Sequence, residues 1–548
     1  MKEKKSKQKI IVVGIDGATF TLLKPWMDKG YLPNFMNIYE KGAKAMLRSV
    51  TPAVTIPAWT SFSTGVNPGK HGAYDFLKKT NGDGFRPITS KDIGSRHIWQ
   101  LLTDNEKKVI VINAPTSYPP ERVNGFLISG MLTPNLDSEF TYPKSLKDEL
   151  LKCGYKTTAV FGSGGDSKLG GEGTSFARSI RFADNKTILE VTKAFDDVEE
   201  IRARTAFRLM DRIKPDFTFV LFDSSDRLEH QFWTDDLSHI LLRHYGKLDS
   251  ILSGFLKRMD DNTVIMLVSD HGMKPLEKII HVNNVLEDLG LFVPNTSSRI
   301  KSAAVCLARK AVGFSRKIGV PVHKILAKEI AYRCVEKLVG ASFNKEKTKA
   351  CFINASSSGI WVDEKDRDYE KTRDRIVERF NALKDPDKGD PVIKAYRRED
   401  IYKGPYVKDA PGIMLDFADG YNLSPIIASD RSALRKVHYM VRPSVGDAAG
   451  QHAKNGIFMA YGTGIKNTRL DGLSITDAAP TIIHMMGLPV PEDMDGRVAR
   501  EIFEPGSLFY EKKISFKKAE KRNAQSDIVW KDRDREIIED RLRSFGYL

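Results

Sequence analysis

The chain has 548 residues, of which 41% are hydrophobic and 29% are charged. This composition is typical of a soluble globular protein, and the length allows a large core with accessory regions. No apolar run approaches the roughly 20 residues that a membrane-spanning helix needs, and the four cysteines lack CxxC spacing and are too few for a disulfide framework. The net charge of +15 favours acidic partners such as phosphorylated substrates, nucleic acid or an anionic membrane surface.

Residues 1–9 form a basic tail that leads directly into the first predicted strand, residues 10–15. No apolar signal segment precedes this strand, so we expect a cytoplasmic protein. Asp16 and Gly17 follow the strand. An Asp-Gly pair in this position often makes only a turn, so Asp16 becomes a candidate functional residue only in combination with others.

The next candidate is Thr55, which stands two residues before Pro57, after a loop and before a predicted helix. A threonine hydroxyl is a weak nucleophile unless a metal ion or a base stabilises the alkoxide. The N–H groups at the start of a helix can help to hold phosphoryl oxygens. A lone Thr-x-Pro usually marks a turn before a helix, so this interpretation of Thr55 depends on metal ligands elsewhere in the chain.

Residues 10 to about 290 alternate short Val/Ile/Phe-rich runs with longer mixed segments. The runs predict strands at 10–15, 108–113, 126–130, 217–222 and 263–268, and apolar spacing predicts a helix over 187–212. This alternation is typical of a parallel sheet covered by helices. Since parallel strands end at one edge of a sheet, side chains that follow different strands can converge there.

Three further groups of Asp and His residues lie beside apolar runs. Asp226 and His230 follow the strand at 217–222, and their spacing of four places them on one face of a helix. Asp270 and His271 follow the strand at 263–268, and His452 precedes the apolar run at 456–461. Oxygen and imidazole ligands without thiolate suit Zn²⁺ or Mn²⁺, and two such ions about 4 Å apart can clamp an in-line phosphoryl transfer. The pattern therefore predicts cleavage of phosphate or sulfate esters.

The pattern changes after His271. Residues 299–339 form a basic, mostly helical stretch, and 350–425 combine a possible strand at 359–362 with charged helix and loop. The sheet pattern resumes at 456–461 and a helix is predicted at 477–486. We therefore expect a tail at 1–9, a catalytic core at 10–290 and 426–505, an inserted cap or substrate region at 291–425, and a charged helical tail at 506–548.

The order of these motifs resembles the alkaline phosphatase superfamily, specifically its type I phosphodiesterase and nucleotide pyrophosphatase branch. Supporting stretches are Asn113–Glu121, Pro57–Phe62, Asp477–Thr481 and Met494–Arg497. The resemblance runs from about Ile10 to Arg497, without much of the insert. It implies an α/β fold in which helices sandwich a mostly parallel sheet and a cap domain is inserted.

The resemblance also implies a metal-dependent phosphodiesterase that uses two divalent ions, zinc as first choice and manganese as second. One ion would be surrounded by Asp16, Thr55, Asp270 and His271, and the other by Asp226, His230 and His452. Thr55 would be phosphorylated and then released by water. The expected substrate is a phosphorylated small molecule or nucleotide, with no obligate nucleic acid, whereas the oligomeric state is left open.

One position departs from the branch. The Thr-x-Pro of its nucleotide pyrophosphatases is commonly followed by an Asn whose amide supports a phosphate oxygen, but this chain has Ala58 and Trp59. The hydrogen bond to that phosphate oxygen must therefore come from another group. The candidates are the backbone N–H of Thr55 or Ile56 and the side chain of Lys70. Sulfatases carry Cys or Ser and then x-Pro-x-Arg at this place, so sulfatase activity is not expected.

Two alternatives remain open from the sequence. A phosphomonoesterase or phosphomutase would use the same metals, because the site recognises the common phosphoryl group. A non-catalytic protein that binds nucleic acid or an anionic membrane is suggested by residues 299–339, where ten basic residues less two acidic ones give a local charge of +8. That stretch also suits a solvated cap helix that packs its apolar side on the core.

Overall fold

The computed structural model describes residues 8–80, 84–157, 185–234, 236–295, 343–427, 431–443, 448–520, 522 and 532–545. The basic stretch 299–339 therefore lies outside the described residues. No helix among the described residues is long and apolar enough to cross a membrane.

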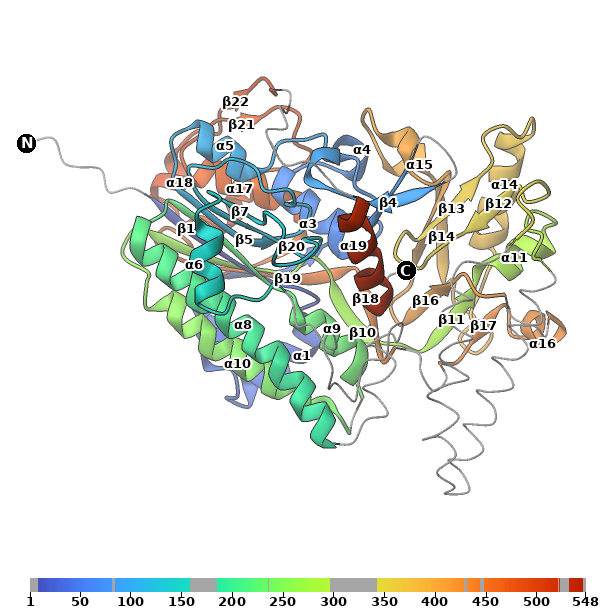
Figure 1. The fold of residues 1–548 in the computed structure, drawn as a ribbon, viewed down its shortest axis with the longest axis horizontal. Helices are drawn as coiled ribbons and strands as arrows, with labels where there is room; N and C mark the ends of the chain where they lie inside the picture. Colours follow the sequence, from blue (N-terminus) through green and yellow to red (C-terminus); the bar gives the residue numbers. More distant parts are fainter. Residues whose placement is uncertain are drawn as a thin grey trace, which may run out of the picture.

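A nine-stranded sheet forms the centre of the molecule (Figure 1). Its order is β20-β2-β19-β9-β1-β8-β5-β6-β7. Only β19 and β7 run antiparallel to their neighbours, so the expected mostly parallel sheet is confirmed. In chain order the strands are β1 (Lys9–Ile15), β2 (Ala43–Arg48), β5 (Val109–Ala114), β6 (Gly125–Ser129), β7 (Thr141–Tyr142), β8 (Phe217–Phe222), β9 (Thr263–Val268), β19 (Asn455–Gly462) and β20 (Thr468–Ser474).

The inner strands are apolar on both faces because helices cover both. Every residue of β5, β8 and β9 is buried. Alternate residues of β1 contribute to different hydrophobic clusters, as Val12 packs with α3, α5 and α17 while Val13 packs with α1, α2, α6, α8 and α10. These helices are α1 (Phe20–Asp28), α2 (Pro33–Lys41), α3 (Thr55–Thr64), α5 (Ile98–Asp104), α6 (Leu146–Lys152), α8 (Asn185–Ile213), α10 (Ser238–Leu256) and α17 (Ala478–Met485).

A second hydrophobic core lies on the right of Figure 1 and extends from Ile280 to Met440. It contains a four-stranded sheet, β12-β13-β15-β14, and a three-stranded sheet, β16-β11-β17. The predicted limits of the insert, 291 and 425, stay a prediction, although β11 and α11 already belong to this second core. Its elements are β11 (Lys278–His281), α11 (Val282–Asp288), β12 (Ala350–Phe352), β13 (Gly359–Val362), α14 (Tyr369–Asn381), β14 (Ile393–Arg397), α15 (Arg398–Ile401), β15 (Ile413–Phe417), β16 (Tyr421–Ser424), α16 (Arg431–Lys436) and β17 (Met440–Val441).

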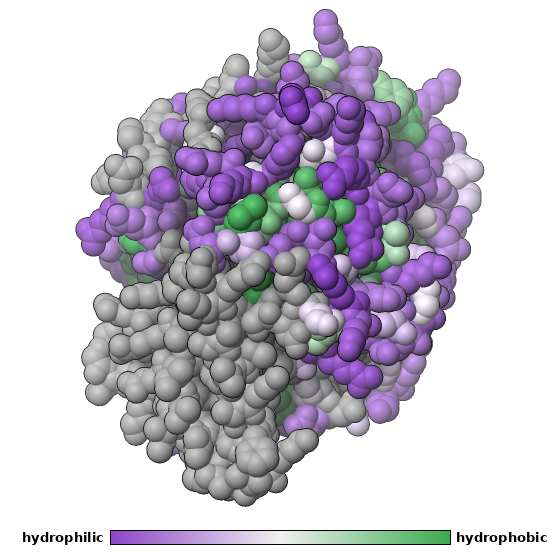
Figure 2. Space-filling view, turned by 90° about the vertical axis from the view of Figure 1, so that its right-hand side faces the viewer, coloured by the Kyte–Doolittle hydropathy of each residue, from purple (hydrophilic) through white to green (hydrophobic). Residues whose placement is uncertain are grey.

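Where described residues are seen on the face at the side of this second core, they are mostly hydrophilic, with some apolar side chains gathered near the centre of the view (Figure 2). The remaining elements are short or terminal. They are α4 (Pro68–His71), β3 (Leu77–Lys79), β4 (Phe85–Pro87), α9 (Ser224–Phe232), β10 (Gly272–Pro275), β18 (Gly450–Ala453), β21 (Val490–Pro491), α18 (Leu508–Glu511), β22 (Phe516–Lys517) and α19 (Asp532–Phe545).

Candidate metal centre and nucleophile

The structure brings the predicted Asp and His residues to one edge of the sheet. Asp16 follows β1, Asp270 and His271 follow β9, and α9, which carries Asp226 and His230, follows β8. These three strands are parallel neighbours in the order β9-β1-β8, so their carboxyl ends lie side by side. Sequence reasoning based on strand ends therefore predicts their convergence.

His452 reaches the same edge by a different route. It lies in β18, directly before β19, and β19 is antiparallel to β9. The start of an antiparallel strand lies where its parallel neighbours end, so a residue before β19 meets residues after β9. The ring of His452 accordingly stacks on the ring of His271, with their centroids 3.7 Å apart.

The first ligand group consists of Asp226, His230 and His452. The Nε2 atom of His452 lies 3.1 Å from Asp226 Oδ1, and Nε2 of His230 lies 3.5 Å from the same oxygen. The two Nε2 atoms are 2.9 Å apart. One oxygen and two nitrogens thus face a common point, which is the donor set of a three-ligand metal site.

The second group consists of Asp16, Asp226 and His271, with Asp270 beside it. His271 Nε2 lies 3.6 Å from Asp16 Oδ1 and 3.1 Å from Asp270 Oδ2. All four side chains are buried. Asp226 belongs to both groups, so the two candidate sites are adjacent and share a carboxylate.

The hydrogen bonds of the three imidazoles select one tautomer. The Nδ1 atoms of His230, His271 and His452 lie 2.8 to 3.1 Å from the carbonyl oxygens of Gly450, Gly272 and Ala53 respectively. A carbonyl only accepts, so each Nδ1 must carry the proton and donate it. In the neutral imidazole each Nε2 then presents a lone pair, and a backbone acceptor of this kind is the usual orienting partner of a metal-bound histidine.

Carboxylates outnumber cationic side chains in this arrangement. Of the three imidazoles only His452 has a raised pKa: burial opposes the rise, but the charge of Asp226 outweighs it. Burial raises the pKa of Asp16 well above its ordinary value, and the charges of Asp270 and Asp226 raise it further. Burial, followed by the charge of Asp226, raises the pKa of Asp270 to about 7. Burial lowers the pKa values of His230 and His271. Neutral imidazole lone pairs and carboxylates that face one another at about 3 Å repel unless protons or cations lie between them, so the donor set fits divalent metal ions.

Thr55 is the first residue of α3 and is fully buried. Its Oγ1 has no hydrogen-bond partner among the described residues. Contacts on either side of Thr55 lead to both ligand groups, because Ala53 O accepts from His452 and Trp59 Nε1 donates to Asp16 Oδ2 at 3.0 Å. The candidate nucleophile therefore lies on a segment attached to both predicted metal sites.

Trp59 was not recognised as a site residue from the sequence. It lies one helical turn after Thr55, and its ring fills the space beside Gly14, where a Cβ would come within 2.8 Å of the indole. The spacing of four from Thr55 and the glycine in β1 are the available signals, but neither identifies a partner 43 positions away. Trp59 holds one oxygen of Asp16 and leaves the other, Oδ1, facing His271.

We expect Trp59→Phe to lower the affinity for metal at the Asp16 group by about 10–100-fold. The phenyl ring keeps most of the packing but removes the indole N–H that orients Asp16. Equilibrium titration of the metal-free protein with zinc measures the change. Trp99→Phe is the matched control, because Trp99 is buried in the same cluster while its Nε1 has no hydrogen-bond partner in the described part of the chain. Equal losses in both variants would contradict an orienting role.

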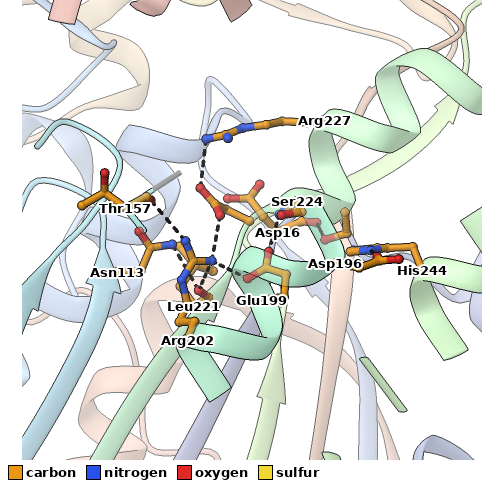
Figure 3. A network of polar contacts seen from close by, with 12 residues as sticks. Asp16, Asn113, Thr157, Asp196, Glu199, Arg202, Leu221, Ser224, Arg227 and His244 are labelled. Carbon is orange, nitrogen blue, oxygen red and sulfur yellow. Dashed lines mark hydrogen bonds and ion pairs between the residues drawn. The ribbon is translucent and has the colours of Figure 1, made fainter. Parts of the chain in front are cut away.

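A buried ion-pair network positions α9, which carries Asp226 and His230 (Figure 3). Arg202 of α8 donates to Glu199 Oε2 at 2.5 Å and to Asp223 Oδ1 at 2.9 Å. The other oxygen of Glu199 accepts from the backbone N–H of Ser224 at 2.8 Å, at the start of α9. Arg227 forms a further pair with Asp223 at 3.0 Å. Two cations thus balance two carboxylates at the point where β8 turns into α9.

Arg202→Met is expected to cost about 3–5 kcal/mol of unfolding free energy, because it leaves a buried carboxylate without its partner. The start of α9 should also shift and weaken metal binding by its ligands. Chemical denaturation and zinc content measure the two effects. Arg212→Met provides the control on the same helix, since the Arg212 side chain is 55% exposed and surface pairs contribute about 0–1 kcal/mol. Similar destabilisation by both substitutions would contradict this role of Arg202.

The two proposed substrate contacts lie in different places. Ile56 follows Thr55 in the first turn of α3, where backbone N–H groups lack helical acceptors. Lys70 donates to Asp493 O and pairs with Asp495, whose own N–H donates to Gly65 O at the far end of α3. A substrate contact by Lys70 stays a prediction, but these bonds engage its amine away from Thr55.

Solved structures similar to this chain share its fold. Murine ectonucleotide pyrophosphatase/phosphodiesterase 5, solved as an inactive variant in complex with AMP, is 13% identical, with 91% of this chain and 100% of that chain covered and a TM-score of 0.52. Phosphonoacetate hydrolase from Sinorhizobium meliloti, in complex with phosphonoformate, is 14% identical, with 88% and 95% covered and a TM-score of 0.53. Both confirm the alkaline phosphatase-like architecture.

The sequence comparisons identify the family. No curated protein matches the chain. The family described as type I phosphodiesterase / nucleotide pyrophosphatase matches residues 10–431, which is more than half of the chain. This range includes the candidate nucleophile Thr55 and all the predicted metal ligands except His452. The matched range ends before His452, which the structure nevertheless places against Asp226 and His271. The chain belongs to the type I phosphodiesterase/nucleotide pyrophosphatase family of phosphoester hydrolases.

Proposed function

We propose that the chain hydrolyses phosphodiesters by a phosphothreonine mechanism that uses Thr55 and two divalent cations. One observation carries this proposal: two adjacent groups of buried or half-buried Asp and His side chains share Asp226 and flank the segment that begins α3. Their carboxylate oxygens and Nε2 atoms lie 2.9 to 3.6 Å from one another, and the Thr55 hydroxyl lacks a hydrogen-bond partner in the described chain.

The donor set suggests which cations bind. Asp226, His230 and His452 would hold one ion, while Asp16, Asp270 and His271 together with Thr55 would hold the other. Imidazole and carboxylate without thiolate suit zinc first and manganese second. When bound, the two cations would neutralise the carboxylates and polarise the oxygens of the phosphoryl group.

The residues of the chain would act in two steps. Thr55 Oγ1 forms a bond to phosphorus and releases its proton to solvent. The bond between phosphorus and the leaving oxygen breaks, and that oxygen takes the electron pair and a proton from solvent. Water then attacks the phosphothreonine, the bond to Oγ1 breaks, and Thr55 regains a proton. The N–H groups of Thr55 and Ile56, at the positive end of α3, would hold the phosphoryl oxygens in both steps.

A phosphorylated small molecule or a nucleotide is the proposed substrate class. The family description and the AMP complex of the murine relative support a nucleotide. Ala58 lacks the amide common in the branch, so the substrate need not share the contacts of those enzymes. A diester is the preferred substrate because the family that the chain matches is described by its phosphodiesterase activity.

The zinc-loaded protein tests the proposal when it is assayed with bis-p-nitrophenyl phosphate and p-nitrophenyl phosphate. We expect the diester to give the higher kcat/KM, and a chelator to abolish turnover of both. Turnover of the monoester at a much higher kcat/KM would reject the diesterase assignment in favour of a phosphomonoesterase. Activity that survives complete removal of metal would reject the two-metal mechanism itself.

A further inference from the structure

Large apolar side chains are exposed in an unusual concentration near the end of the core. Leu508 is 83% exposed, Phe516 is 62% exposed and Tyr510 is 39% exposed. These three lie within nine consecutive residues. The other large apolar side chains found exposed in the described part of the chain are scattered, at Tyr31, Met46, Leu151, Leu189 and Val437. We refer to residues 508–518 as the 508–518 patch.

The patch is held firmly by the core. Ser507 Oγ accepts from Tyr510 N at the start of α18, and Phe509 is buried against Phe503 with their ring centroids 5.4 Å apart. Phe509 therefore anchors α18 while its neighbours Leu508 and Tyr510 face solvent. Fixed apolar side chains of this kind offer a preformed contact surface rather than a frayed end.

The second half of the patch is attached to the same part of the core. β22 pairs with β21, and Lys512 Nζ donates to Gly487 O, three residues before Val490 of β21. Because both attachments lie within residues 487–491, α18 and β22 are presented at one end of the molecule, on the upper left of Figure 1. Leu508 and Phe516 therefore belong to two elements that are anchored to the same segment of the core.

Lysines are interspersed with these apolar side chains. Residues 508–518 contain Lys512, Lys513, Lys517 and Lys518 against the single acid Glu511, so four positive charges less one negative charge give +3. Among the residues that the structure describes, neither Lys513 nor Lys518 forms an ion pair. Long lysine side chains can lie along an apolar surface and keep the ammonium in water.

We propose that the 508–518 patch is a docking surface for an anionic lipid bilayer. Leu508 and Phe516 would enter the boundary between headgroups and acyl chains, while the lysines remain among the anionic headgroups. Lys517 pairs with Glu520 at 3.3 Å, but Lys513 and Lys518 have no ion-pair partner among the described residues. An anionic membrane supplies acidic groups for these two ammoniums and an apolar layer for Leu508 and Phe516. The docking would hold the phosphodiesterase core peripherally at a membrane surface.

Vesicle binding by the full chain tests this inference. Sedimentation with phosphatidylcholine vesicles is compared with sedimentation with vesicles of equal parts phosphatidylcholine and phosphatidylglycerol. We expect binding to the anionic vesicles only, and a reduction by about 10-fold or more in Leu508→Ser/Phe516→Ser. Lys513→Gln/Lys518→Gln should also bind more weakly and lose part of the salt dependence.

The matched control is Leu189→Ser/Tyr31→Ser, which removes two exposed apolar side chains elsewhere and should bind as wild type does. Hydrolysis of bis-p-nitrophenyl phosphate in solution should be unchanged in Leu508→Ser/Phe516→Ser, which shows that the variant is folded. Absence of vesicle binding by wild type, or unchanged binding by this variant, would overturn the proposal. A dimer that Leu508→Ser/Phe516→Ser dissociates, without vesicle binding, would instead assign the patch to a contact between two copies of the chain.

Discussion

Replacing Thr55 by alanine is expected to abolish phosphoester hydrolysis and to leave both metal sites loaded. The substitution removes the only atom of Thr55 that can attack phosphorus, and loss of a nucleophile reduces kcat by about 10⁴-fold or more. The hydroxyl is buried and has no hydrogen-bond partner in the described chain, so its removal breaks no hydrogen bond. The six Asp and His ligands remain, and the metal content should therefore change little.

Initial rates with bis-p-nitrophenyl phosphate and metal analysis of the same sample measure both parts of this prediction. Thr64→Ala is the matched control, because Thr64 is buried in the same helix and donates to Thr60 O at 2.7 Å. It should retain nearly full kcat at somewhat lower stability. Full activity in Thr55→Ala would remove Thr55 from the mechanism, while loss of metal in that variant would make it primarily a ligand.

Much of the core and of the candidate site could be predicted from the sequence, because the relevant signals are local. The strand at 217–222 is a continuous apolar run, and β8 occupies the same residues. The helix predicted at 187–212 is α8, Asn185–Ile213. Asp16, Asp226 and Asp270 each follow such a run, so the edge of a parallel sheet brings them together without knowledge of any side-chain contact.

Other features could not be predicted because they depend on contacts between distant segments. His452 reaches the site because β19 runs antiparallel to β9. The periodicity of apolar residues in a sequence does not reveal the direction of a strand. The bond from Trp59 to Asp16 and the contact of Arg202 with Asp223 join different elements. Lys70 is also such a case: it was one of the candidates to replace the missing Asn as a donor to phosphate, and its bonds lead to the 493–495 segment.

Removal of the metal ions is expected to destabilise the chain increasingly as the pH rises. Burial, then the charge of Asp226, raises the pKa of Asp270 to about 7 in the metal-free fold, compared with about 3.9 in an unfolded chain. The folded state therefore binds this proton more tightly than the unfolded state does. Its contribution to stability is fully present below about pH 4 and is lost as the pH rises through about 7.

The substitution Asp270→Asn tests this electrostatic origin. Each pKa unit corresponds to about 1.4 kcal/mol, so the loss between pH 4 and 8 is at most about 4 kcal/mol. Asparagine keeps the shape of the side chain without the charge, and metal-free Asp270→Asn should therefore be more stable than metal-free wild type at pH 8. In excess zinc the order should reverse, because the variant has lost a ligand that stabilises the loaded fold.

Chemical denaturation of wild type and Asp270→Asn is measured at pH 5 and at pH 8, each with chelator and with excess zinc. Asp216→Asn removes a buried carboxylate outside the site, where it accepts from Lys108 N, and its effect should have the same sign with and without zinc. The reversal of sign in Asp270→Asn is the decisive observation, because a purely structural role would destabilise both forms. Equal stability of metal-free wild type at the two pH values would show that the buried carboxylates carry no uncompensated charge.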